Sequence, residues 1–226
     1  KLVKEYQATL IQGSGVDTQR FAPVPEPEGE LVVALIARML WEKGVGELVE
    51  AVKILKRRQV FCKIMLVGVP DVNHPSAIGE NQLLSWVKEG IVDWLGFQSD
   101  VPAVLAKSHI VCLPSYREGM PLSLIEAAAC ARPIITTDVP GCREAVEHGV
   151  TGFLVPLKDS VAIADALQKL LVDKELRQKM GKNGRNLVMQ RFAKEIVIQK
   201  TFAVYHSLLK NKWPYCLDAN GKIQRI

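Results

Sequence analysis

The stretch HIVCLPSYREGMPLSLIEAAACARPIITTD (residues 109–138) has the pattern of one complete strand–helix–strand unit. Its two ends, 109–114 and 133–138, are short apolar runs without polar alternation, which is typical of strands covered on both faces. The segment between them, 121–131, has the length and composition of a helix. A strand, a helix and a second strand in this order predict two parallel strands joined by a right-handed crossover.

The same alternation continues on both sides of this unit. We expect further strands at 31–37, 62–68, 92–97 and 152–156, and helices at 45–58, 77–90, 100–108 and 141–149. The sequence therefore predicts an α/β fold, a Rossmann-like doubly wound parallel sheet. Beyond Pro156 the pattern is helical, and we expect additional C-terminal helices at 160–173, 175–192 and 193–213. The proline-rich segment 21–30 is expected to be a linker or turn, and no structure is assigned to the tail 214–226.

Composition gives few restrictions on function. The chain has 226 residues, 48% of them hydrophobic and 23% charged, and 29 basic against 24 acidic residues give a net charge of 29 − 24 = +5. The densest basic run is Lys56–Arg58, and neither zinc-ligand spacing nor an aromatic-rich basic strip accompanies it. Nucleic acid is therefore not expected as a partner. Anionic ligands or an acidic membrane surface fit the charge equally well.

Cysteine usage and hydropathy favour a cytoplasmic protein. The five cysteines form no CxxC pair, and we expect buried free thiols in a reducing compartment. The chain has neither a signal-peptide pattern nor an apolar run of the ~18–20 residues that a membrane helix needs. It also begins without Met, in mid-pattern, which indicates a fragment of something longer.

The loop after the strand 109–114 has the features of an anion site. Ligands of open α/β sheets bind beyond the carboxyl ends of the strands. The predicted helix has Pro121 in its first turn, where a missing N–H is harmless, and the preceding Met120 cannot cap it. Free backbone N–H groups at a helix start attract anions. The candidate donors are the amides of Gly119, Met120, Leu122 and Ser123.

Two carboxylates flank this anion site. Glu118 precedes the helix and Glu126 lies more than a turn inside it, and the segment between them contains no basic partner. A carboxylate accepts two hydrogen bonds and therefore suits a pair of vicinal hydroxyls. An anion between two diols is the layout of a nucleotide sugar. The alternative is that these acids only complement the helix dipole.

A second group of polar residues is expected on the same rim. In ARMLWEKGVGELVEAV (37–52), Arg38 and Lys43 flank the loop after the strand 31–37, and Gly44 opens the next helix. Two cations beside an amide cluster could clamp a diphosphate. The alternative is ordinary solvated surface charge.

These segments resemble a known family. ARMLWEKG, VDWLGF, LPSYREGMPLSLIEAAACARPIITTD, GCREAV, HGVTGFLV and NGR…RF are similar to the carboxyl-terminal half of a family 4, or "group 1", glycosyltransferase. Such enzymes are retaining transferases of the GT-B architecture, in which two Rossmann-like domains face each other across a cleft. The resemblance runs from about Ala8 to Trp213.

The resemblance implies roles for individual residues. Arg38 and Lys43 would bind the donor diphosphate, Glu118 would contact the transferred sugar and assist catalysis together with both cations, and Glu126 would hold the ribose. The backbone of Gly96 and Phe97 would border the base. The loop and first helical turn would meet phosphate or sugar through Gly119, Met120, Pro121, Leu122 and Ser123.

The implied chemistry needs no added cofactor. The chain has no DxD motif, and its four histidines show no metal-ligand spacing, so no bridging metal is indicated. His109 begins an apolar strand and is expected to be structural. UDP or GDP is the expected nucleotide of the donor. The EGMP sequence of residues 118–121 replaces the commoner Glu-Gly-Phe-Gly, and Ala131 stands where a glycine often follows the helix, so the sugar stays open.

The resemblance covers only a donor-binding half, which we expect to comprise residues 1–213. We expect an amino-terminal acceptor domain elsewhere in the full-length protein, with the last helix (about 194–213) packing toward it and the chain inactive alone. Polysaccharide, lipopolysaccharide or glycolipid synthesis is the implied process, with peripheral contact at the inner face of the membrane through that domain.

Other functions remain open. A sugar-nucleotide epimerase or a phosphorylase could use this architecture. A phosphorylase would be expected to carry a pyridoxal lysine in a recognisable setting, and none is found. An NAD oxidoreductase has less support, because QGSGVD (12–17) is followed by Thr18 where a third glycine belongs. A nucleotide-sugar-binding subunit without turnover is also possible.

Overall fold

The structure, a computed structural model, describes residues 8–209, 215–217 and 223–225. Its centre is a six-stranded parallel sheet in the order β3-β2-β1-β4-β5-β6. This is the Rossmann order, so the predicted fold class is confirmed. The strands are β1 (Val32–Ile36), β2 (Lys63–Val67), β3 (Asp93–Trp94), β4 (Ile110–Leu113), β5 (Ile134–Thr137) and β6 (Gly152–Val155).

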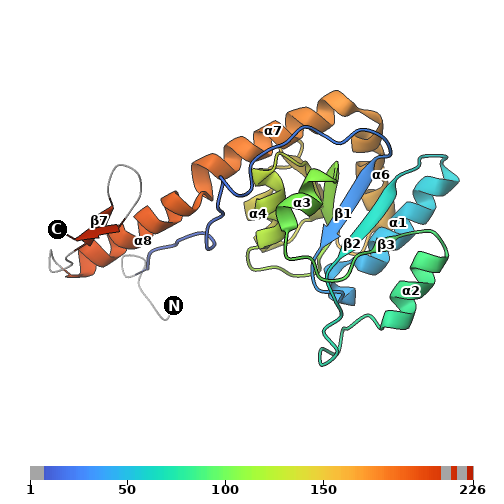
Figure 1. The fold of residues 1–226 in the computed structure, drawn as a ribbon, viewed down its shortest axis with the longest axis horizontal. Helices are drawn as coiled ribbons and strands as arrows, with labels where there is room; N and C mark the ends of the chain where they lie inside the picture. Colours follow the sequence, from blue (N-terminus) through green and yellow to red (C-terminus); the bar gives the residue numbers. More distant parts are fainter. Residues whose placement is uncertain (1–7, 210–214, 218–222, 226) are drawn as a thin grey trace.

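Helices cover both faces of this sheet (Figure 1). On one face α1 packs against α6, and on the other α4 packs against α7. The helices are α1 (Val45–Arg57), α2 (Glu80–Lys88), α3 (Val101–Ala106), α4 (Leu122–Ala129), α5 (Pro140–Ala145), α6 (Ser160–Val172), α7 (Lys174–Arg191) and α8 (Lys194–Leu209), with a short 3-10 turn η2 (Trp41–Lys43) before α1.

Local sequence explains why most of these elements form where they do. All four residues of β4 are buried, as expected for a central strand without polar alternation. The helices α3, α6 and α7 each begin after an aspartate whose carboxylate accepts a backbone N–H of the first turn, at Asp100, Asp159 and Asp173. Such caps satisfy amides that the helix leaves free, and they fix the helix start.

Most elements are a few residues shorter than the sequence predicts, and tertiary contacts explain two of the larger differences. The strand predicted at 92–97 stops at Trp94, because Gly96 adopts a left-handed conformation (φ 64°) and its carbonyl accepts from Gly68 N–H at 2.8 Å. The helix predicted from residue 77 begins at Glu80, because Ala77 bridges to Leu40 instead. The helix predicted over 141–149 ends at Ala145, where the next residue becomes extended.

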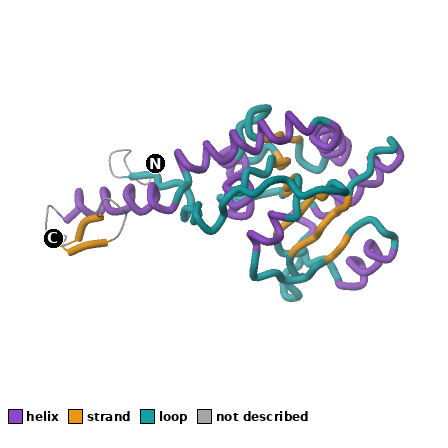
Figure 2. The backbone as a smooth tube through the Cα atoms, turned by 45° about the horizontal axis from the view of Figure 1, so that its top comes forward, coloured by secondary structure: helices purple, strands orange, loops and turns teal. Residues whose placement is uncertain are grey.

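The N-terminal segment and α8 meet at one point of the domain. Val16 N–H donates to Phe192 O at 2.8 Å, and Lys194 N–H donates to Val16 O at 3.0 Å. The Lys194 ammonium also contacts the Asp17 carboxylate at 2.6 Å. From this point α8 runs away from the sheet, beside the N-terminal loop (Figures 1 and 2). The tail forms an antiparallel pair, β7 (Tyr215–Leu217) with β8 (Ile223–Arg225), which the sequence did not indicate.

The cysteines of the described core are free thiols, as predicted. Cys112, Cys130 and Cys142 are buried and Cys62 is half-buried. Burial raises the pKa of the Cys130 thiol to about 11, so this group is a protonated core residue at neutral pH. Within the described ranges, no helix is long and apolar enough to cross a membrane.

Candidate donor site

In a sheet of this order, the ligand crevice is expected at the carboxyl edge between β1 and β4. These two strands are neighbours, but the chain leaves β1 toward β2 and leaves β4 toward β5. The loops that follow them therefore diverge at the carboxyl edge and leave space for a ligand. The loop after β1 carries Arg38 and Lys43, and the loop after β4 carries Glu118. The fold thus brings both groups of predicted site residues to one crevice.

The start of α4 provides free amides, with one correction to the prediction. Pro121 is the residue before the helix, with extended backbone (φ −74°, ψ 101°), and α4 begins at Leu122 without a side-chain cap. Within the described parts of the chain, no group accepts a hydrogen bond from the amides of Gly119, Met120, Leu122 or Ser123. These donors point to an anion-binding helix start.

Lys43 and Glu118 form an ion pair across the crevice. The Lys43 Nζ lies 2.6 Å from Glu118 Oε1, and their side chains are only 16% and 12% exposed. From the sequence, the two residues were expected to contact different parts of one donor, and the segment between Glu118 and Glu126 contains no basic residue. The partner lies 75 positions away along the chain, where only the fold brings it close.

Backbone contacts hold the Lys43 loop in place from two sides. Gly44 has a left-handed conformation (φ 74°), and a Cβ there would lie 2.2 Å from Pro114 O, so the loop lies directly on the end of β4. Tyr116 N–H donates to Glu42 O at 2.8 Å from the same side. From the other side Trp41 N–H donates to Ser76 O at 2.8 Å. Lys43 therefore projects from a backbone with little freedom.

Arg38 lies at the other end of the loop, beside an apolar hollow. Its guanidinium pairs with Asp71 at 2.7 Å in an exposed contact. The hollow has a volume of about 250 Å³, and Arg38 lines it together with Val69, Phe97 and Val101. Phe97 is 74% exposed at the edge of this hollow. The carbonyl of the neighbouring Gly96 is already engaged by Gly68 N–H. That the backbone of these two residues borders a base stays a prediction.

Glu126 is half-buried in the second turn of α4. Burial raises the pKa of its carboxyl group, while the charge of Arg20 opposes this rise. Among the described residues none forms a hydrogen bond or close ion pair with this carboxylate. A desolvated acceptor without a hydrogen bond is costly in a folded domain, and a ligand hydroxyl would offset the cost.

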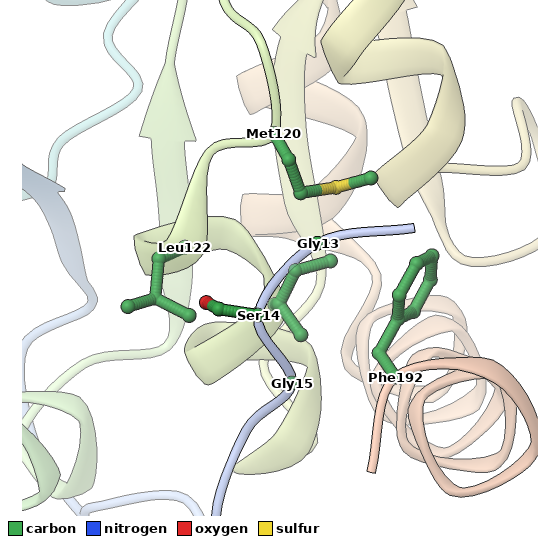
Figure 3. Close-up of a pocket in the computed structure, with 7 residues that line it drawn as sticks. Gly13, Ser14, Gly15, Met120, Leu122 and Phe192 are labelled. Carbon is green, nitrogen blue, oxygen red and sulfur yellow. The ribbon is translucent and has the colours of Figure 1, made fainter. Parts of the chain in front are cut away.

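A small pocket lies between the N-terminal segment and the loop before α4 (Figure 3). Gly13, Ser14 and Gly15 cross in front of α4, next to Met120 and Leu122. A Cβ at Gly13 would lie 3.1 Å from Met120 Cγ. QGSGVD was considered above as an incomplete dinucleotide motif. Neither its contact with Met120 nor the pairing of Asp71 with Arg38 could be predicted, because both depend on long-range packing.

The comparisons with known proteins identify the family of the chain. Residues 16–187 match the profile of the family described as "Glycosyl transferases group 1". A curated relative from Campylobacter jejuni, N,N'-diacetylbacillosaminyl-diphospho-undecaprenol alpha-1,3-N-acetylgalactosaminyltransferase, is 32% identical over 92% of this chain and 57% of its own length. A second, from Escherichia coli, is 28% identical over 88% of this chain and 54% of its own length: UDP-Gal:alpha-D-GlcNAc-diphosphoundecaprenol alpha-1,3-galactosyltransferase.

One solved structure shows which part of a group 1 glycosyl transferase the chain resembles. The C-terminal domain of a group 1 glycosyl transferase (LpcC) from Francisella tularensis is 27% identical, with a TM-score of 0.67, and the match covers 79% of this chain and 99% of that domain. The chain spans about half the length of the curated relatives it matches. The chain belongs to the group 1 glycosyltransferase family, and its likeness is to the C-terminal domain.

Proposed function

We propose that this chain is the nucleotide-sugar-binding domain of a retaining glycosyltransferase, which transfers a sugar from a nucleoside diphosphate sugar to an acceptor. The observation that carries the proposal is the pairing of Lys43 with Glu118 beside the free amides of α4, at the switch point of the sheet. Cations and amides at one crevice suit a diphosphate, and the carboxylate suits sugar hydroxyls.

Each part of the donor has a proposed place. The diphosphate lies on the amides of α4 and is held by Lys43 and Arg38, which stabilise the negative charge that grows on the leaving nucleotide without a metal. The base lies in the hollow beside Phe97, the ribose meets Glu126, and the sugar meets Glu118. UDP is the first nucleotide to test, because the name of the Escherichia coli relative includes UDP-Gal.

The acceptor side of the reaction lies outside this chain. The relatives named above are about twice as long, and their names specify undecaprenol-linked acceptors. We therefore propose that an amino-terminal domain of the full-length protein supplies the acceptor site, and that α8 (Lys194–Leu209) packs toward it. A lipid-linked acceptor would bring the protein to the inner face of a membrane for polysaccharide or glycolipid synthesis.

The test is calorimetric titration of the chain with UDP, GDP, ADP and TDP, with and without Mg²⁺, together with a radiolabelled transfer assay. We expect binding of one nucleoside diphosphate, little effect of Mg²⁺, and no transfer by the chain alone. Arg38→Ala and Lys43→Ala should weaken diphosphates most and the monophosphate least. A chain that binds none of the four nucleotides would contradict the donor site, and robust transfer would contradict the need for a second domain.

A further inference from the structure

We infer that Glu118 is the internal counter-ion of Lys43 in the donor-free domain, and that the donor diphosphate displaces it. Glu118 then becomes available to the sugar only when the diphosphate is in place. This inference rests on the proposed function, because it assigns an order to two contacts of the same site.

The geometry makes the pair a direct competitor of the diphosphate. The contact of 2.6 Å is a charge-assisted hydrogen bond, and both side chains are at least four-fifths shielded from water, at 16% and 12% exposed. Neither charge can be left without a partner at low cost in such a setting. A diphosphate that reaches Lys43 brings negative charge next to Glu118, and like charges at this distance repel.

The exchange must occur through side-chain rotation, since the backbone on both sides is fixed. A Cβ at Gly141, at the start of α5, would lie 2.4 Å from Glu118 O and 2.2 Å from Gly119 O, so α5 lies directly on the Glu118 loop. The Lys43 loop lies equally close to the end of β4 through Gly44. Rotation of the Glu118 side chain is therefore the movement that separates the pair without a shift of either loop.

Three roles for Glu118 predict three different results. A residue that only contacts the sugar would not affect binding of the free nucleotide. A residue that still orients Lys43 in the complex would strengthen binding of the free nucleotide, so its loss would weaken that binding. A residue that competes with the diphosphate for Lys43 would weaken binding of the free nucleotide. Removal of its charge would therefore strengthen that binding, because Lys43 becomes free for the diphosphate.

The experiment compares Glu118→Gln with the unaltered chain, using UDP, GDP and inorganic pyrophosphate as probes in calorimetry. For the nucleotide that binds, and for pyrophosphate, we expect Glu118→Gln to bind on the order of tenfold more tightly. Glu118→Asp, which keeps the charge, should lack this gain. The matched control is Asp71→Asn, at the exposed pair with Arg38 (34% and 55% exposed), where we expect less than about a twofold change.

Unchanged or weaker nucleotide binding by Glu118→Gln overturns this inference and leaves the donor site intact. If no variant binds UDP, GDP, ADP or TDP, both the proposed function and this inference are overturned. If Glu118→Gln does not fold, the unaltered chain still provides a test. The ¹³C resonance of the Glu118 carboxyl group, assigned with Glu118→Asp, must shift when UDP or GDP binds, and an unmoved resonance in the bound domain overturns the displacement.

Discussion

At the scale of single residues, Glu126 is a proposed ribose contact that should reduce the stability of the free domain. Its carboxylate is half-buried, forms no hydrogen bond with the described residues, and has a pKa that burial raises above the ordinary value of 4.5, against the opposing charge of Arg20. In the pH range between the ordinary and the raised value, the folded domain binds more protons than the unfolded chain. Its free energy of unfolding therefore decreases as the pH rises through this range.

Glu126→Gln should therefore stabilise the free domain and weaken nucleotide binding. The amide removes the buried charge, so the melting temperature at neutral pH should rise. The same change removes a charged acceptor for the ribose hydroxyls and should cost about 1.5–3 kcal/mol of binding free energy for both the nucleoside diphosphate and the nucleotide sugar. Glu80→Gln is the control, because Glu80 is exposed in the first turn of α2 and should only complement the helix dipole. A lower melting temperature with unchanged nucleotide affinity would show that Glu126 only complements the helix dipole.

His109 is a structural histidine, and it makes stability depend on pH. Its Nδ1 accepts from Val32 N–H at 3.0 Å, so the neutral ring must donate from Nε2 to Pro27 O, which lies at 3.0 Å. Burial lowers the pKa of His109 from the ordinary value of 6.5. Below that value the unfolded chain takes up a proton that the folded ring resists, so the free energy of unfolding should fall as the pH drops from 7 to 5.

Denaturant titrations at pH 7, 6 and 5 test this dependence. His109→Gln, whose amide keeps one donor and one acceptor, should lose part of the pH dependence. His206→Gln on α8 should keep all of it. Equal slopes for His109→Gln and the unaltered chain would show that another group causes the pH effect.

At the scale of elements, one glycine sets how closely α5 approaches the Glu118 loop. A Cβ at Gly141 would overlap the carbonyl oxygens of Glu118 and Gly119, at 2.4 and 2.2 Å. Gly141→Ala should therefore shift the loop, lower stability by about 1–3 kcal/mol, as overpacking does, and weaken nucleoside diphosphate binding. Gly79→Ala is the matched control, because a Cβ at that position meets nothing within 4 Å. Full affinity in a folded Gly141→Ala would mean that the loop position does not affect the site.

The helices and strands also show which features of the fold could be predicted from the sequence. β4 and α4 follow from local apolar patterns, and the rim loops follow from strand order, so the crevice could be predicted. The end of β3 could not, because a hydrogen bond from Gly68 to Gly96 decides it. The Lys43–Glu118 pair was missed for the same physical reason. Local patterns report which residues face the core, but not which distant side chains the fold brings into contact.

At the scale of the whole molecule, arginines of α7 attach the N-terminal segment to the domain. Arg185 donates to the carbonyl oxygens of Thr18, Phe21 and Ala129 at 2.8–3.0 Å. Arg177 forms two hydrogen bonds with the Glu26 carboxylate, at 2.8 and 3.0 Å. The segment 21–30, predicted as a linker or turn, is thus held fixed against the domain, and we call it the strap. It leads into β1, and its attachment keeps the N-terminal chain next to the start of α8.

The Arg177–Glu26 pair should be the most costly ion pair to break by single substitution. Its side chains are 4% and 11% exposed, whereas those of the Arg58–Asp165 pair are 35% and 52% exposed. Arg177→Ala leaves a shielded carboxylate without its partner and should lower the free energy of unfolding by about 3–5 kcal/mol. Arg58→Ala, which breaks the exposed pair, should cost less than about 1 kcal/mol. The double variant Arg177→Met with Glu26→Leu should recover much of the loss, because no buried charge remains unpaired. Chemical denaturation of the four proteins measures these differences, and equal losses for Arg177→Ala and Arg58→Ala would show that burial does not set the strength of the strap.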